Sequence, residues 1–259
     1  MESKQISCFA VFDGHGGSRC SQWLADNLEE DLRCADSWRQ EGLTLPKRLK
    51  GALVQALKRA EYKYLDLAFK ESDHSGACVV VGLYCEGHVC VANVGDCLAV
   101  LYLPGADSHV DLSVAHRSRQ PEEARRIEAA GGLVINNRAF GVLEPSRSIG
   151  DLDLKRHCRG AVTADPYIRE VVIPPPQQPA EGAAKKKPAL QEAPFLLFAS
   201  DGLWDVVAAP VVVDLTKKSL KVWRKKPAKS NPARQLVRAA IRHGTMDDTT
   251  AIVVHFDAW

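Results

Sequence analysis

Four short apolar runs, separated by turn-forming dipeptides, constrain the fold of this chain more than any other feature. The runs are Ala77–Tyr84, His88–Val94, Cys97–Leu103 and His109–Val114, and the turns between them carry Glu86-Gly87, Gly95-Asp96 and Pro104-Gly105. Such a series is typical of consecutive antiparallel hairpins. The first three runs are apolar almost throughout, so both faces of each strand must be covered. A sheet packed on a second sheet, with helices outside, would cover them.

Helical patterns flank these runs. Apolar residues recur at helical spacing over about Ser18–Cys34, Pro46 opens a second helix that extends to about Lys70, and Pro121 opens a third that ends at Gly131-Gly132. A last helix is predicted over about Pro232–His243. Further strands are predicted at Ile6–Phe12, Ile168–Ile173, Phe195–Ser200 and Thr250–Phe256. These elements predict the α+β class, with one domain over residues 1–259 and no internal repeat.

One segment does not fit this pattern. Pro174–Pro194 contains six prolines and three consecutive lysines. It cannot bury enough apolar surface to become ordered, so we expect an exposed insertion between two strands. The lysines Lys185–Lys187 could form a nuclear signal, but a solvated loop is the favoured interpretation.

Composition excludes several classes of function. The net charge is +2, from 34 basic and 32 acidic residues, which gives no electrostatic basis for binding nucleic acid. No apolar run is long enough to cross a bilayer, no signal peptide is visible, and nothing requires a partner chain, so we expect a monomer away from membranes.

The eight cysteines form no CxxC pair and lie mostly in apolar runs. We therefore expect reduced thiols in the core, which indicate a reducing compartment, the cytoplasm or the nucleus. We do not expect a zinc site.

Three aspartates share one sequence context. Asp13 follows the run FAVF, Asp201 follows FLLFAS, and Asp247 precedes the strand TAIVV. Each lies at the edge of a predicted buried strand beside glycine or a tight turn, so the three carboxylates could converge at one rim of the sandwich. Converging carboxylates repel one another unless a cation neutralises them. All-oxygen ligands favour Mg²⁺ or Mn²⁺.

Two such ions close together could activate a water for in-line attack on phosphorus. His15, two residues after Asp13, could act as general acid toward the leaving alkoxide. Each residue also has a plainer interpretation. An Asp-Gly pair is most often a turn, Asp247-Asp248 could cap a hairpin, and a single histidine is more often structural. The shared strand-edge context favours the functional interpretation.

Eight short motifs then occur in a fixed order along the chain. They are VFDGHGG at Val11–Gly17, SGA at Ser75–Ala77, ANVGD at Ala92–Asp96, RIEAAGG at Arg126–Gly132, GVLEPSRSIGD at Gly141–Asp151, ADPYI at Ala164–Ile168, ASDGLWDVV at Ala199–Val207 and GTMDDTTAIVV at Gly244–Val254. Over nearly the whole chain this series resembles the metal-dependent protein phosphatases of type 2C. GVLEPSRSIGD and the following DLDLKRH resemble the integrin-linked kinase-associated phosphatase branch.

The resemblance implies a fold, an activity and a set of site residues. The fold is a β-sandwich of two antiparallel sheets flanked by helices, and the activity is hydrolysis of phosphoserine and phosphothreonine in protein substrates. Two Mn²⁺ or Mg²⁺ ions are implied. Asp13 should bridge both ions, the carbonyl of Gly14 should bind the second, and Asp201 and Asp247 should bind the first. His15 matches the proposed general acid.

The chain also departs from the family pattern. It starts after the region that carries an arginine for the substrate phosphate and a Glu-Asp pair near the metals. Glu2 is not a substitute, since eleven extended residues could place it up to roughly 36 Å from Asp13. Ala115 stands where many members have an aspartate, Asp248 replaces a usual asparagine, and Leu98 replaces a usual arginine. A catalytically impaired pseudo-phosphatase that binds phosphoproteins or kinases, or another metal-dependent phosphoester hydrolase, therefore stays an alternative.

Overall fold

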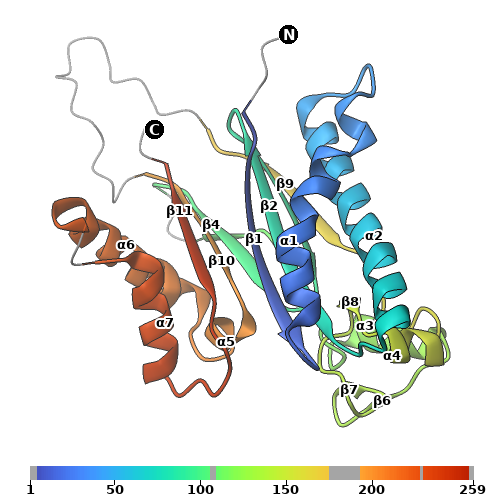
Figure 1. Ribbon diagram of the computed structural model, residues 1–259. Helices are drawn as coiled ribbons and strands as arrows, with labels where there is room; N and C mark the ends of the chain where they lie inside the picture. The colour runs from blue at the N-terminus through green and yellow to red at the C-terminus, as the bar shows by residue number, and fades with distance from the viewer. Residues whose placement is uncertain (1–4, 106–108, 175–192, 228–229, 257–259) are drawn as a thin grey trace.

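Two antiparallel sheets stacked face to face form the centre of the molecule, and helices cover both outer faces (Figure 1). The computed structural model describes residues 5–105, 109–174, 193–227 and 230–256. The predicted α+β sandwich is confirmed. Among these residues, no helix combines the length and the apolar character that a membrane span requires.

Each sheet joins strands that are distant in sequence. The first has the order β1 (Ser7–His15), β2 (Gly76–Cys85), β3 (His88–Val94) and β9 (Tyr167–Val172), and the short β8 (Ile149–Gly150) also pairs with β2. The second has the order β11 (Ala251–His255), β10 (Phe195–Ala199), β4 (Leu98–Tyr102) and β5 (His109–Asp111). A small hairpin is formed by β6 (Val134–Ile135) and β7 (Arg138–Ala139).

The long helices form the two outer layers. Against the first sheet lie α1 (Arg19–Arg33) and α2 (Leu45–Glu71), and against the second lie α6 (Ala209–Lys225) and α7 (Pro232–Arg242). Shorter elements fill the connections: the 3₁₀ helix η1 (Asp36–Trp38), α3 (Pro121–Ala129), α4 (Leu152–His157) and α5 (Asp201–Trp204). The helix α6 has no counterpart among the predicted elements, because its run Val211–Val213 is β-branched and resembles a strand.

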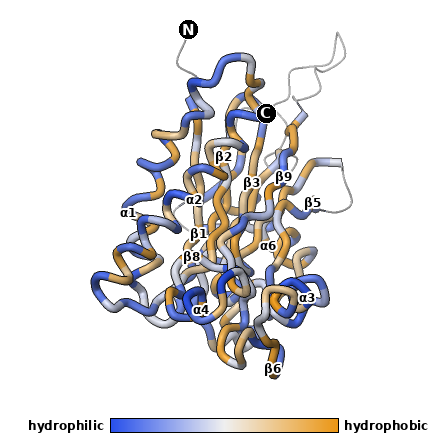
Figure 2. Tube along the Cα trace, turned by 90° about the vertical axis from the view of Figure 1, so that its right-hand side faces the viewer, coloured by the Kyte–Doolittle hydropathy of each residue, from blue (hydrophilic) through white to orange (hydrophobic). Residues whose placement is uncertain are grey.

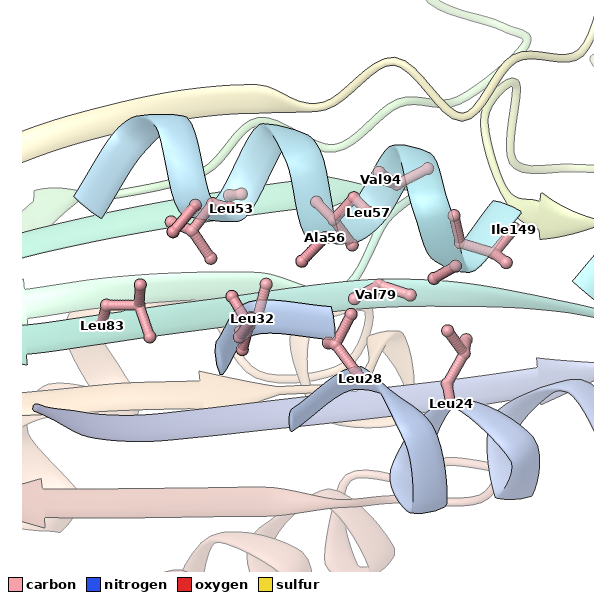
Figure 3. Close-up of a cluster of buried hydrophobic side chains, with 14 of the residues drawn as sticks. Leu24, Leu28, Leu32, Leu53, Ala56, Leu57, Val79, Leu83, Val94 and Ile149 are labelled. Atoms are coloured by element: carbon pink, nitrogen blue, oxygen red, sulfur yellow. The ribbon is translucent and has the colours of Figure 1, made fainter. Parts of the chain in front are cut away.

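Strand β2 is buried on both faces because it lies between two apolar layers. Val79 and Leu83 point toward α1 and α2, while Val80 packs into the space between the sheets. Figure 3 shows Val79 beside leucines of both helices, including Leu28 and Leu57. Complete burial of one such side chain contributes about 1.5–3 kcal/mol, so this layer fixes the position of β2 and, through pairing, of β1.

The chain changes sheets after β3. The prediction of consecutive hairpins is therefore wrong at Gly95-Asp96, although β2 with β3 and β4 with β5 do pair as expected. Strand β3 takes β9 as its second neighbour, and β4 pairs with β10 instead. Gly95 permits the crossing, since its φ is +96° and a Cβ there would lie 2.3 Å from Sγ of Cys78.

Strand β1 is longer than predicted. The expected end at Phe12 is wrong, because Asp13, Gly14 and His15 continue the pairing opposite Cys78, Ala77 and Gly76.

The predicted insertion falls largely on residues 175–192, and the lysine triplet and Glu2 also lie outside the described residues. At its end, Ala193 and Pro194 are buried rather than exposed. Of the eight cysteines, five are buried.

Candidate functional site

The predicted site residues lie around one cavity at an end of the sandwich. Asp13, Gly14, His15, Asp201 and Asp247 all line this cavity of about 510 Å³. Asp13 and His15 enter it from the last residues of β1, which pairing with β2 holds in place. The structure thus brings all five residues together; their chemical roles stay predictions.

Asp201 and Asp247 are brought together by contacts between two chain segments. Asp201 is the first residue of α5, directly after β10 and Ser200. Oγ of Ser200 accepts a hydrogen bond from the N–H of Thr250 at 3.0 Å and donates one to the carbonyl of Asp248 at 3.2 Å. Gly202 allows this approach, since a Cβ there would lie 2.4 Å from the Asp248 carbonyl oxygen.

Negative charge is concentrated at the cavity. Burial, and then the carboxylates of Asp96, Asp13 and Asp247, raise the pKa of Asp201. Burial also raises the pKa of Asp13; a hydrogen bond with Asp201 opposes that rise, and the charges of Asp247 and Asp96 add to it. A cation among these groups would relieve the repulsion.

A buried arginine already offsets part of this charge. The side chain of Arg117 is 7% exposed. Its Nε donates to Asp96 at 3.1 Å, its Nη2 donates to Asp205 at 2.6 Å, and Nη2 also lies 3.5 Å from Oδ2 of Asp201. Asp96, Arg117 and Asp205 had no assigned role in the sequence analysis. No local pattern links them, because 21 and 88 positions separate Arg117 from its two hydrogen-bond partners.

His15 is held by a second carboxylate that the sequence analysis did not single out. Its Nε2 lies 2.7 Å from Oδ2 of Asp151, and the same oxygen accepts a hydrogen bond from Oγ of Ser148 at 2.5 Å. Gly76 leaves the space for this pair, because a Cβ there would lie 2.2 Å from Asp151 Oδ2 and 2.5 Å from His15 Nε2. The pair therefore depends on a glycine at that point of β2.

The donor atoms suit a hard cation, although the site is not preformed. Within the described ranges, no three His, Cys, Asp or Glu side chains already form a metal-binding group. Asp247 is exposed, and its Oδ1 accepts from the N–H of Asp248. In contrast, Oδ1 of Asp201 is buried and has no hydrogen-bond partner among the described residues. A buried carboxylate oxygen without a partner, beside other carboxylates, fits Mg²⁺ or Mn²⁺.

One guanidinium is among the groups that line the cavity. Arg138 of β7 lines it together with His74. Arg138 is half exposed and donates to the carbonyl of Val142 at 3.0 Å and to Glu144 at 3.1 Å. A guanidinium at this position can meet a substrate phosphate that enters from solvent.

Comparison with known proteins gives one consistent family. The family model described as Protein phosphatase 2C matches residues 2–249. The probable protein phosphatase 2C 52 of Oryza sativa subsp. japonica is 34% identical over 99% of this chain and 45% of its own length. The integrin-linked kinase-associated serine/threonine phosphatase 2C of Bos taurus is 32% identical over 96% of this chain and 66% of its own length. The chain thus spans roughly half to two thirds of these relatives.

Solved structures share the fold. A serine-threonine phosphatase 2C from Toxoplasma gondii superposes with a TM-score of 0.78 at 23% identity, over 97% of this chain and 85% of that one. A C. elegans sex determining protein gives the same TM-score at 24% identity, over 96% and 56%. At these identities the structural likeness supports the fold alone.

Proposed function

The chain belongs to the protein phosphatase 2C family, and from that premise we propose that it hydrolyses phosphoserine and phosphothreonine in proteins, using two Mn²⁺ or Mg²⁺ ions. The observation that carries the proposal is the convergence of Asp13, Asp201 and Asp247 on one cavity, beside an unpartnered buried oxygen of Asp201. His15 lines the same cavity, and it is the residue that we propose as proton donor to the leaving group.

The carboxylates and one carbonyl would hold the ions. Asp13 would bridge the two, with Asp201 and Asp247 on the first and the carbonyl of Gly14 on the second. When bound, such ions supply an acidified water and positive charge for the phosphoryl oxygens. Arg138, which lines the cavity and is half exposed, would orient the phosphate of the incoming protein.

His15 would complete the reaction. As the P–O bond to the serine or threonine oxygen breaks, that oxygen needs a proton to leave as an alcohol. Nε2 of His15 is engaged by Asp151. With the ring as the imidazolium, the carboxylate holds the Nε2 proton and orients the ring, and the proton on Nδ1 would pass to the leaving oxygen, which leaves a neutral imidazole with its proton on Nε2.

A direct experiment tests the proposal. The purified 259-residue chain is incubated with phosphoserine and phosphothreonine peptides in Mn²⁺, in Mg²⁺ and in a chelator, and released phosphate is measured. We expect release only with metal, and at least a hundredfold less from Asp201→Asn. Metal-independent release, or equal release from the variant, would contradict the proposal.

A second candidate rests on Arg117. Because this guanidinium already lies between Asp96, Asp205 and Asp201, part of the carboxylate charge is balanced without any ion. A catalytically impaired phosphoprotein-binding module is the function that this arrangement supports. It predicts phosphopeptide binding with no release of phosphate at any metal concentration.

A further inference from the structure

A second cavity lies on the opposite side of α4 from the cavity that Asp13, Asp201 and Asp247 line, which we call the acidic cavity. It has a volume of about 690 Å³ and is bordered by α2, α4 and the segment 159–166. Figure 2 turns this side of the molecule toward the viewer, with α4 near one end of α2. Apolar side chains of Val54, Leu65 and Leu152 contribute to its lining. We call this cavity the basic groove because of its charged lining.

Positive charge dominates the basic groove. Four basic and two acidic side chains line it: Lys58, Lys155, Arg156 and Arg159 against Glu61 and Asp165. Nζ of Lys155 lies 2.5 Å from Glu61, so these two charges cancel. Lys58, Arg156 and Arg159 are exposed and form no ion pair with any described residue.

One of the unpaired cations, Arg156, packs on an aromatic ring. The guanidinium of Arg156 lies 5.3 Å from the ring centre of Phe69, which is itself 62% exposed. Such stacking restrains a long side chain and lowers the entropy lost when it binds an anion. Apolar and unpaired cationic side chains in one lining suit a polypeptide with acidic side chains rather than a free inorganic ion.

The helix α4 connects the two cavities. Its Asp153 and Leu154 line the acidic cavity, while Leu152, Lys155 and Arg156 line the basic groove. A helix with its side chains is about 10–12 Å wide, and an extended chain advances about 3.3 Å per residue. A peptide crossing α4 would therefore need about three to four residues between the two cavities.

From this geometry we propose that the basic groove docks an acidic segment of the phosphoprotein substrate, beginning three to four residues from the phosphorylated residue. The placement of the phosphorylated residue relative to the groove rests on the proposed function. The binding of an acidic peptide in the groove does not rest on it, because a peptide without phosphate should bind as well. The substrate class is then narrowed to phosphorylated sites that have aspartate or glutamate clusters nearby.

The first experiment measures binding without catalysis. A fluorescein-labelled peptide of glutamates and aspartates, lacking phosphate, is titrated with the full chain, and anisotropy gives Kd. The triple variant Lys58→Glu, Arg156→Glu, Arg159→Glu should raise Kd at least tenfold. The matched triple variant Lys221→Glu, Arg224→Glu, Lys225→Glu changes the net charge equally on exposed positions of α6 and should leave Kd within twofold. Equal effects of the two triple variants would overturn the proposal.

The second experiment measures turnover. Phosphopeptides with acidic clusters three to six residues from the phosphoserine, on either side, are compared with neutral analogues and with p-nitrophenyl phosphate. The groove variant should lower kcat/KM at least fivefold for the phosphopeptide whose acidic cluster lies on one particular side of the phosphoserine. For the neutral peptide and for p-nitrophenyl phosphate, kcat/KM should change by less than twofold. Equal kcat/KM for acidic and neutral peptides in the unmodified chain would overturn the proposal.

Two controls separate the possible failures. If p-nitrophenyl phosphate is not hydrolysed but the acidic peptide binds through the groove, docking stands and the proposed catalysis fails. If vesicles of phosphatidylserine or a single-stranded oligonucleotide bind the groove as tightly as the peptide, the groove is a general anion patch and the proposal fails. Should the triple variant not fold, the double variant Lys58→Gln, Arg159→Gln keeps the Arg156 stacking and should still raise Kd at least threefold.

Discussion

Nε2 of His15 lies 2.7 Å from Oδ2 of Asp151, although 136 positions separate the two residues. The contact joins the end of β1 to the residue immediately before α4. Asp151 is buried and has a left-handed backbone with φ of 53°, which its N–H supports by donating to the carbonyl of Ser75. The histidine that would protonate the leaving group is thus oriented by a residue in a strained, fixed position.

Asp151→Asn should separate proton transfer from the rest of catalysis. The amide keeps the shape but removes the charge that fixes the ring, so we expect kcat on a phosphoserine peptide to fall about tenfold or more. Activity on p-nitrophenyl phosphate should change less than threefold, because nitrophenolate leaves without a proton. Asp66→Asn, which breaks a surface pair with Lys70, is the control. An equal loss on both substrates would contradict this role of Asp151.

Gly76→Ala should displace the same pair by steric overlap. The added Cβ would lie within 2.5 Å of both His15 Nε2 and Asp151 Oδ2. We expect about 1–3 kcal/mol of destabilisation, measured by urea unfolding, together with the substrate-dependent loss predicted for Asp151→Asn. Gly82→Ala in the same strand overlaps Phe198 instead. Gly82→Ala should be destabilised to a similar degree, while the ratio of its activities on the phosphoserine peptide and on p-nitrophenyl phosphate stays unchanged. A shifted ratio would show that any strain in β2 changes the two activities unequally, and would contradict a specific effect on the His15–Asp151 pair.

Asp13→Asn should change metal binding and metal-free stability in opposite directions. Burial and neighbouring carboxylates raise the pKa of Asp13, so its ionised form is disfavoured in the folded chain. Removing that charge should raise Tm in chelator, and it should abolish the further rise that Mn²⁺ produces in the unmodified chain. Calorimetric titration should show at least a tenfold weaker Mn²⁺ affinity. Unchanged affinity would remove Asp13 from the metal site.

The sequence predicted the carboxylates of this site better than their surroundings. Asp13, Asp201 and Asp247 could be found because each borders an apolar strand, and strand periodicity is a local signal. Arg117 and Asp151 act through partners 88 and 136 positions away, and nothing in a local pattern reports such contacts. The same limit explains the wrong hairpin at Gly95, where the choice between sheets depends on β9 and β10.

The missed helix α6 shows a different limit. Its valines favour a strand by local propensity, yet Pro210 at the first turn and Arg224 and Lys225 at the last turn are helix boundary signals. Packing of α6 against the second sheet decides the outcome, since Val212 and Leu220 are buried there with strand residues. Tertiary contacts thus outweigh β propensity in this segment.

Stability should depend on pH through Glu123. Burial alone would raise its pKa, but hydrogen bonds from Arg147, Ser146 and Arg126 outweigh burial and lower the pKa to about 2. The ionised carboxylate therefore contributes about 3 kcal/mol to the free energy of unfolding at pH values above 4.5, its ordinary pKa. This contribution falls as the pH drops below 4.5 and is lost as the pH passes through 2. The difference in unfolding free energy between the unmodified chain and Glu123→Gln should shrink steadily below pH 4.5. Exposed Glu122→Gln is the control, and a pH-independent difference would refute the assignment.

The free edge of β1 should govern self-association. Within the described ranges, β1 pairs with β2 on one side only, and a cavity of about 490 Å³, lined by Ile6, Phe12 and Leu28, lies between β1 and α1. An unpaired edge beside apolar side chains is a template for another strand. Although nothing in the sequence requires a partner chain, we expect sedimentation velocity to show association that grows with concentration. Ile6→Lys should suppress it without lowering Tm, because Ile6 is 37% exposed. Val222→Lys, half exposed on α6, should not. A chain that stays monomeric at all concentrations, or equal effects of both lysines, would show that this edge is already protected.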